Sequence, residues 1–181
     1  CTACFQSYKQ KYCWIIFFPI SFVPRIYCRL LLKLYFKKDI KNDRKTYEEY
    51  ELPTRSTKHS AGYDFRAIYD FTIMPGEEKK IYTGCKVKME SDEVLMLYVR
   101  GSVGTKFGVR MSNSVGIIDS DYYNNPTNEG HVLFQLYNSG ITPYVVKKGE
   151  AYGQGLFQKY LTVDDEEEIT EERVYGFGST N

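Results

Sequence analysis

The chain has 181 residues, of which 43% are hydrophobic, enough for one domain with a buried core. Its 24 lysines and arginines nearly balance its 23 aspartates and glutamates, so the composition does not indicate a protein that binds nucleic acid through bulk positive charge. Four of the five cysteines fall within the first 28 residues, which is not the distribution of a disulfide framework or a zinc site. We therefore expect thiols in a reducing compartment, the cytoplasm.

The first 31 residues contain an apolar run, CWIIFFPISFV, which Pro24 and Arg25 interrupt. The run is too short to span a bilayer, and no small-residue cleavage site follows it cleanly, so we expect no membrane association. The first methionine is Met74, which leaves open a fragment, a processed product or a translated sequence that begins upstream of the natural start. We favour the last, and predict that residues 1–31 lie outside the fold.

From about residue 32 the sequence is typical of short strands separated by turns. Seven segments carry β-branched or aromatic residues with partial alternation, and turn signals such as Pro-Gly and Lys-Gly separate them. In chain order they are KLYF, YDFRAIYDFTI, KKIYTGCKVKM, EVLMLYV, HVLFQLYN, TPYVV and AYGQGLFQKYL. No window shows a long amphipathic helical period. The sequence therefore predicts an all-β sandwich, jelly roll or barrel over residues 32–170.

Two early segments of this predicted domain combine glycines with polar groups. STKHSAGYDFRA places Asp64 between aromatic residues, which by itself is typical of a carboxylate at a strand end. RGSVGTKFGVR combines Arg100 and Ser102 with backbone amides freed by glycine. That combination indicates a phosphate-binding nest, although glycine-rich loops often only turn the chain.

The segment NSVGIIDSDYYNNPTNEG carries two carboxylates in a predicted hairpin, Asp119 and Asp121. They would share one face of a straight strand, close to Asn113, Gly116 and Tyr122. Carboxylates in a small space need partners, and they often serve metal or general-base chemistry.

The end of the chain, RVYGFGSTN, has glycines that cost backbone entropy to order. Alone it is typical of an unstructured polar terminus. Yet Arg173, Phe177, Ser179 and Thr180 together offer the guanidinium, ring and hydroxyls that suit a phosphorylated aromatic ligand. Gln154, in KKGEAYGQGLF, adds an amide that can donate to phosphate. We predict that residues 171–181 form a mobile arm.

In their order and approximate spacing, AGYDF, RGSVGTK, GIIDSDY, GEAYGQG and RVYGFGST resemble the five motifs of the trimeric dUTPase family. The resemblance covers about residues 32–181, and the insertion YYNNPTNEGH looks like one in a bacterial and phage branch of that family. It implies a jelly roll with a flexible C-terminal arm, and a homotrimer with active sites at its subunit interfaces. It also implies magnesium-dependent hydrolysis of dUTP to dUMP and pyrophosphate. That reaction limits uracil incorporation into DNA and supplies dUMP for dTMP synthesis, with no stable nucleic-acid partner.

The resemblance further implies a role for each site residue. Asp119 matches the carboxylate that orients and deprotonates the attacking water. Tyr122 matches the ring that packs on the deoxyribose and excludes a 2′-hydroxyl, and Asp64 matches the carboxylate that holds water around the magnesium ion. The resemblance also implies that uracil is contacted by Asn113 and the backbone near Gly116. The phosphates would be contacted by Arg100, Gly101, Ser102 and Gln154. The closing arm would contribute Arg173, Phe177, Gly178, Ser179 and Thr180, with Phe177 stacking on uracil.

Two positions depart from the family pattern. The family usually has serine directly after the motif arginine, where this chain has Gly101 followed by Ser102, and it usually has glycine at the position of Tyr175. Either change could slow turnover, which keeps open a non-catalytic nucleotide-binding regulator. A dCTP deaminase shares the jelly roll, but Gln135 stands where that family needs a glutamate to move protons. A jelly-roll carbohydrate binder would explain the aromatic residues but not the ordered phosphate motifs.

Overall fold

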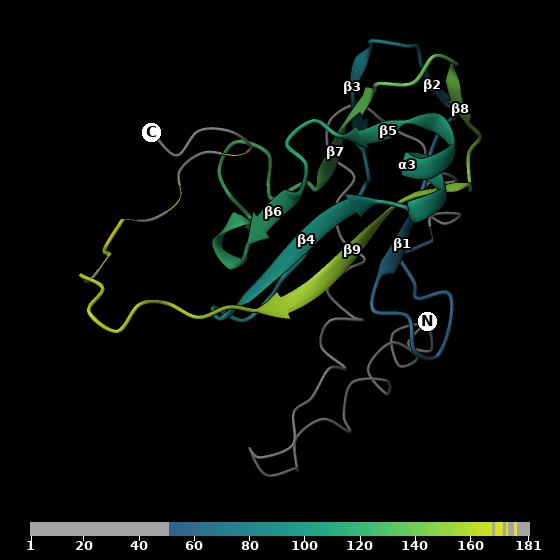
Figure 1. Ribbon diagram of the computed structural model, residues 1–181. Coiled ribbons are helices and arrows are strands. Elements are labelled where there is room, and N and C mark those ends of the chain that lie inside the picture. Colours follow the sequence, from purple (N-terminus) through teal and green to yellow (C-terminus); the bar gives the residue numbers. More distant parts are fainter. Residues whose placement is uncertain (1–50, 168, 172, 174–175, 177–181) are drawn as a thin grey trace, which may run out of the picture.

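The computed structural model describes residues 51–167, 169–171, 173 and 176, and its regular elements within these ranges are almost all strands (Figure 1). The strands are β1 (Tyr63–Arg66), β2 (Phe71–Ile73), β3 (Glu78–Tyr82), β4 (Glu93–Val99), β5 (Val109–Met111), β6 (Gly116–Asp119), β7 (Leu133–Asn138), β8 (Tyr144–Val146) and β9 (Ala151–Lys159). The helical elements of the same ranges are α3 (Gly101–Phe107) and the 3₁₀ turn η1 (Ser120–Tyr122). The predicted all-β fold is confirmed.

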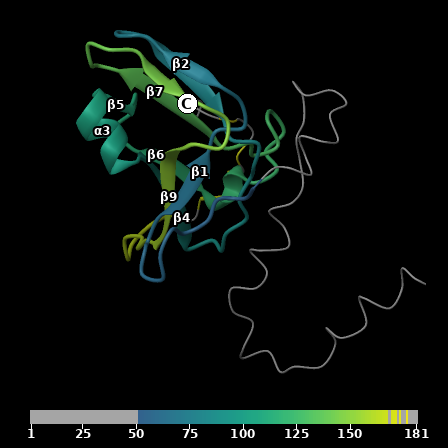
Figure 2. The ribbon, with the colours of Figure 1, turned by 90° about the vertical axis from the view of Figure 1, so that its right-hand side faces the viewer.

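The strands form three antiparallel sheets. One sheet has the order β1-β9-β4-β6, a second has the order β3-β7-β5, and a third pairs β2 with β8. In Figure 2, β7 and β2 lie above β1, β9 and β4. Neighbours in the sheets are distant in the sequence, as in a jelly roll, because each sheet takes strands from both halves of the domain.

Aromatic rings occupy the centre of the core. Phe134 lies 5.1 Å from Phe65 and 5.2 Å from Tyr152, measured between ring centroids, and both pairs meet edge to face. β9 can pass this close because it carries glycine there: a Cβ at Gly153 would lie 2.4 Å from Phe134 Cε1, and one at Gly155 would lie 2.8 Å from Leu95 Cδ1. The two glycines of the GQG segment are therefore needed for β9 to pack closely against Phe134 and Leu95.

The structure differs from the sequence prediction in two segments. YDFRAIYDFTI forms two strands, β1 and β2, instead of one. RGSVGTK forms most of helix α3. The sequence did not predict this helix, because a helix of only seven residues with two glycines shows no long helical period. It ends at Gly108, whose φ of 67° is left-handed and whose N–H donates to the carbonyl of Gly104. KLYF and the predicted boundary at residue 32 lie outside the described residues.

Neither helical element of the described chain is long and apolar enough to cross a membrane. Cys85 is a buried thiol, and the other four cysteines lie outside the described residues.

Candidate active site

Three of the predicted phosphate and magnesium residues gather where β1, β9 and β4 run side by side. Asp64 of β1 pairs in register with Gln154 of β9. Arg100 follows β4 directly, and its Nε lies 3.2 Å from Asp64 Oδ1. Ser56 Oγ donates to Asp64 Oδ2 at 2.5 Å. Three motifs that are far apart in the sequence therefore meet within one chain.

Asp64 is buried, and both of its oxygens have protein partners. A carboxylate offers about four acceptor positions, so these two contacts leave acceptor positions that water could use. Among the described residues no three His, Cys, Asp or Glu side chains converge as a metal site. Magnesium usually keeps several waters and takes further ligands from substrate phosphates. A single carboxylate such as Asp64 is therefore compatible with a magnesium ion that it would hold through the ion's water molecules. The indirect role of Asp64, through water, stays a prediction.

Arg100 leads directly into α3, where Gly101 and Ser102 form the first turn. The N–H groups of Val103 and Gly104 both donate to the carbonyl of Arg100, at 2.9 and 3.2 Å. A helical turn already uses these two amides, so they are not available to a glycine-freed nest, and the predicted phosphate nest as a whole stays a prediction. Gly101 has no conformational requirement of its own: a Cβ there would meet nothing within 4 Å, and its φ is not positive.

The predicted uracil residues lie at the turn between β5 and β6, which belong to different sheets and so do not form the predicted hairpin. Asn113 is exposed in the turn, and its carbonyl accepts a hydrogen bond from the N–H of Val115 at 2.8 Å. Gly116 begins β6, and a Cβ there would lie 3.0 Å from Cβ of Leu97 on β4. Glycine thus lets β6 approach β4 closely where the turn ends.

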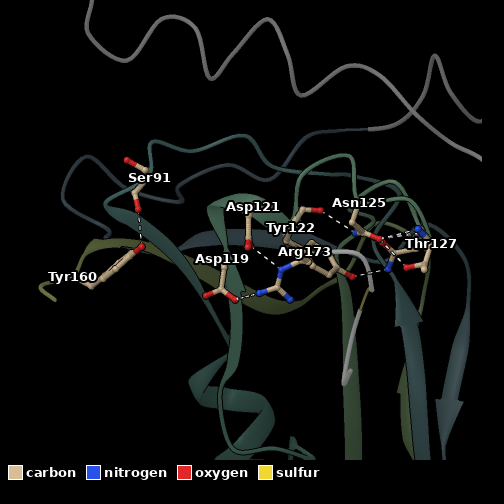
Figure 3. A network of polar contacts seen from close by, with 9 residues as sticks. Ser91, Asp119, Asp121, Tyr122, Asn125, Thr127, Tyr160 and Arg173 are labelled. Atoms are coloured by element: carbon tan, nitrogen blue, oxygen red, sulfur yellow. Dashed lines mark hydrogen bonds and ion pairs between the residues drawn. The ribbon is translucent and has the colours of Figure 1, made fainter. Parts of the chain in front are cut away.

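The two carboxylates lie at the other end of β6. The prediction that they share one face of a straight strand is wrong, because β6 ends at Asp119 and Asp121 belongs to the 3₁₀ turn η1. They meet instead on one guanidinium. Arg173 donates from Nη2 to Asp119 Oδ2 at 2.5 Å and from Nε to Asp121 Oδ1 at 2.7 Å (Figure 3).

The contact of Arg173 differs from its predicted role on terminal phosphates. Its side chain is 16% exposed, whereas the side chains of Asp119 and Asp121 are 50% and 56% exposed. A guanidinium fork recognises carboxylate and phosphate oxygens by the same geometry, so the arginine can serve either partner. Sequence reasoning missed this ion pair because it joins residues 54 positions apart with no local signal.

Tyr122 lies beside this ion pair and is buried. Burial raises the pKa of its phenol, although a hydrogen bond from Asn128 and the charge of Arg173 act in the opposite direction. The phenol is therefore protonated at neutral pH and can donate. Its Oη donates to the carbonyl of His131 at 3.2 Å and accepts from Asn128 Nδ2 at 2.6 Å. The roles of Asn128 and His131 were not predicted, because their segment has the composition of an ordinary loop.

The arm meets the domain again at Gly176, which is buried. A Cβ at this position would lie 2.8 Å from Thr127 Oγ1 and 3.0 Å from Asn128 Nδ2. Glycine is therefore the residue that fits here. The remaining predicted arm residues, Phe177, Gly178, Ser179 and Thr180, and the departure at Tyr175, lie outside the described residues.

The two groups of site residues are separated within one chain. Asp119 pairs with Val94 near the start of β4, whereas Arg100 follows the last residue of that strand. Six residues of extended strand span about 20 Å. Asp119 and Arg100 of the same chain are thus too far apart to contact one phosphoanhydride bond.

In this antiparallel β domain a buried carboxylate pairs with a part-exposed arginine, and two half-exposed carboxylates share a second arginine. Guanidinium groups placed in this way can bind a ligand that carries phosphate or carboxylate groups. The family model of dUTPase matches residues 48–181. The chain belongs to the dUTPase family.

Individual relatives agree with this assignment. The chain is 50% identical over 130 residues to the deoxyuridine 5′-triphosphate nucleotidohydrolase of Lactococcus lactis, which covers 71% of this chain and 87% of the relative. It is 33% identical over 143 residues to the protein of the same name from Haemophilus influenzae. That match covers 75% of this chain and 91% of the relative.

Solved structures agree as well. The crystal structure of dUTPase from Streptococcus mutans superposes with a TM-score of 0.59 at 43% identity, covering 62% of this chain and 88% of that one. A mutant dUTPase from phage phi11 of S. aureus, described with a structural Mg(II) ion, superposes with a TM-score of 0.55 at 18% identity. The match covers 67% of this chain and 90% of that one, and at this identity it supports the fold alone.

Proposed function

We propose that the protein hydrolyses dUTP to dUMP and pyrophosphate, which limits uracil incorporation into DNA and supplies dUMP for dTMP synthesis. The observation that carries the proposal is the 50% identity over 130 residues to a relative named deoxyuridine 5′-triphosphate nucleotidohydrolase. We place the protein in the cytoplasm, where its substrate is an intermediate of nucleotide metabolism.

In the proposed reaction Asp119 holds the attacking water and accepts its proton as the water attacks the α-phosphorus. The bond to the oxygen that bridges the α- and β-phosphates breaks, and the electron pair leaves with pyrophosphate. Arg100, Ser102 and Gln154 stabilise charge on the phosphates. A bound magnesium ion would supply positive charge for the leaving pyrophosphate, with Asp64 holding its water. Asn113 and the backbone at Gly116 read uracil through hydrogen bonds.

We further propose that the active protein is a homotrimer whose sites are shared between subunits. The support is the separation of about 20 Å along β4 between the group at Asp119 and the group at Arg100. A second subunit that brings its own Arg100 to Asp119 would complete a site. An active monomer by light scattering at micromolar concentration would contradict this assembly.

The test of the function is to incubate the purified protein with dUTP, dCTP, dTTP and UTP in the presence of magnesium and to identify the products. We expect dUMP and pyrophosphate from dUTP, with little turnover of the other three. Conversion of dCTP to dUTP would support the deaminase instead. That outcome is disfavoured by Gln135, whose amide donates to the exposed Glu78 at 2.6 Å and carries no titrating group. Binding of dUTP without turnover would support the non-catalytic regulator.

Restoring the family serine at position 101 is expected to help turnover. Gly101→Ser should raise kcat/KM for dUTP by about tenfold, the size of one hydrogen bond to a charged group. The new side chain meets open space, so the melting temperature should not fall. Steady-state kinetics and thermal unfolding check both expectations. A lower kcat/KM at unchanged stability would show that Ser102 already serves the phosphates and that the added hydroxyl interferes.

A further inference from the structure

The insertion loop, residues 123–130, follows Tyr122 directly and folds back against it. We infer that Asn128 of this loop is a positioning residue that holds the Tyr122 ring and thereby sets selectivity for deoxyribose over ribose. The inference rests on the proposed function, in which Tyr122 packs on the sugar of the nucleotide. It assigns a purpose to an insertion whose residues have no role in the proposed chemistry.

The first support is the pair of hydrogen bonds at the Tyr122 hydroxyl, one donated and one accepted. A phenol has one proton to donate, and here the carbonyl of His131 accepts it at 3.2 Å. The phenol oxygen in turn accepts a hydrogen bond from Asn128 Nδ2 at 2.6 Å. The hydroxyl is thus held from two sides, and of these two contacts only the one from Asn128 is made by a side chain and can be removed by substitution.

The second support is that Asn128 is itself held in place. Its Oδ1 accepts from Asn125 Nδ2 at 2.6 Å, and its N–H donates to Asn125 Oδ1 at 3.1 Å. Asn125 is 3% exposed and also donates to the carbonyl of Tyr122 at 3.0 Å. Figure 3 shows Tyr122, Asn125 and Thr127 within this network. The amide that meets the phenol therefore has little freedom to follow a displaced ring.

The third support is the backbone of the insertion loop, which is bent tightly onto Tyr122. Asn124, Glu129 and Gly130 have positive φ angles of 61°, 59° and 79°. A Cβ at Gly130 would lie 2.6 Å from the carbonyl oxygen of Tyr122. Left-handed residues at this density cost free energy, and they persist where the surrounding contacts define the conformation. The loop is therefore built to hold one arrangement against Tyr122.

A ring that must reject one hydroxyl group needs such support. Discrimination against a 2′-hydroxyl depends on close contact, so a ring that is free to shift makes room for it. First contacts with a ligand are accurate when a second layer of hydrogen bonds locks their side chains. Asn128 is placed to provide that layer for Tyr122.

The test compares kcat/KM for dUTP with kcat/KM for UTP, using the full-length protein. Asn128→Ala should lower the ratio of the two by about 3–10-fold, the range expected for loss of one hydrogen bond. Tyr122→Phe removes the hydroxyl from the other side and should lower the ratio by at least as much. In the Tyr122→Phe background Asn128→Ala should have no further effect, because the two groups act through the same bond.

Asn124→Gly is the matched control. It removes an amide from the same loop at a position where glycine tolerates the positive φ, and Asn124 bonds to Lys86 instead of Tyr122. The ratio should stay within about twofold of the wild type, well inside the effect of a lost hydrogen bond.

The outcomes separate the inference from the proposed function. A wild-type protein that does not hydrolyse dUTP would overturn the proposed function. An active and selective wild type with an unchanged ratio in Asn128→Ala would overturn the inference. An equal further loss in the Tyr122→Phe background would also overturn it, because Asn128 would then act by another route. If Asn128→Ala does not fold, Tyr122→Phe alone still decides, since an unchanged ratio in that variant excludes control through the hydroxyl.

Discussion

Replacing Asp119 by asparagine is expected to lower kcat for dUTP by about 10²-fold or more, the usual scale for loss of a general base. The amide has nearly the size of the carboxylate but cannot accept the proton of the attacking water. Asp119 ends β6 with a half-exposed side chain, where a water molecule can reach it. Single-turnover kinetics measures the loss, and calorimetry with a non-hydrolysable dUTP analogue should show that binding remains within a fewfold of the wild type.

Asp121→Asn provides the matched control, because Asp121 lies two residues away and binds the same guanidinium. We expect its kcat to change by less than about threefold, since the Asp121 carboxylate is half exposed and water screens its side of the ion pair. Near-normal turnover in Asp119→Asn would remove Asp119 from the proposed role. A loss of equal size in both variants would point to the ion pair with Arg173 as the important feature, and not to a base at position 119.

Removal of residues 173–181 is expected to reduce kcat/KM for dUTP by roughly 10²–10³-fold. Charge-assisted hydrogen bonds from Arg173 would contribute about 1.5–3 kcal/mol. Stacking of Phe177 on uracil would add about 1 kcal/mol. About 1.4 kcal/mol corresponds to a factor of ten in rate, which gives the range stated. The proposed trimer and the melting temperature should be nearly unchanged, because the buried core of the described chain is formed by residues 65–152.

Arg173→Lys is the sharper version of this experiment. Lysine keeps the charge, but a single ammonium cannot reproduce two nitrogens that bind two carboxylates in a fork. We expect it to recover only a small part of the activity lost on truncation. Full activity of the truncated protein would contradict the proposed arm. Loss of the trimer on truncation would show that residues 173–181 serve assembly instead of closure.

The sequence predicted the strands well because alternating apolar residues and turn-forming pairs are local properties. β4, β7, β8 and β9 each lie within a predicted segment. The helix α3 was missed because seven residues with two glycines carry no helical period. The straight strand through Asp119 and Asp121 was wrong because nothing in the letters GIIDSDY marks the point where β6 becomes a 3₁₀ turn.

For the candidate site, too, the sequence predicted some features and missed others. The sequence by itself determined the family, since five motifs in order depend only on residue identity and spacing. Only the tertiary structure decided which of them meet in one chain: Asp64 lies beside Arg100 and Gln154, while Asp119 lies under Arg173 at the other end of β4. It also decided that Asn128 bonds to Tyr122. Such contacts arise from sheet order and from loops that fold back on themselves, and these depend on packing between distant segments, which no local pattern encodes.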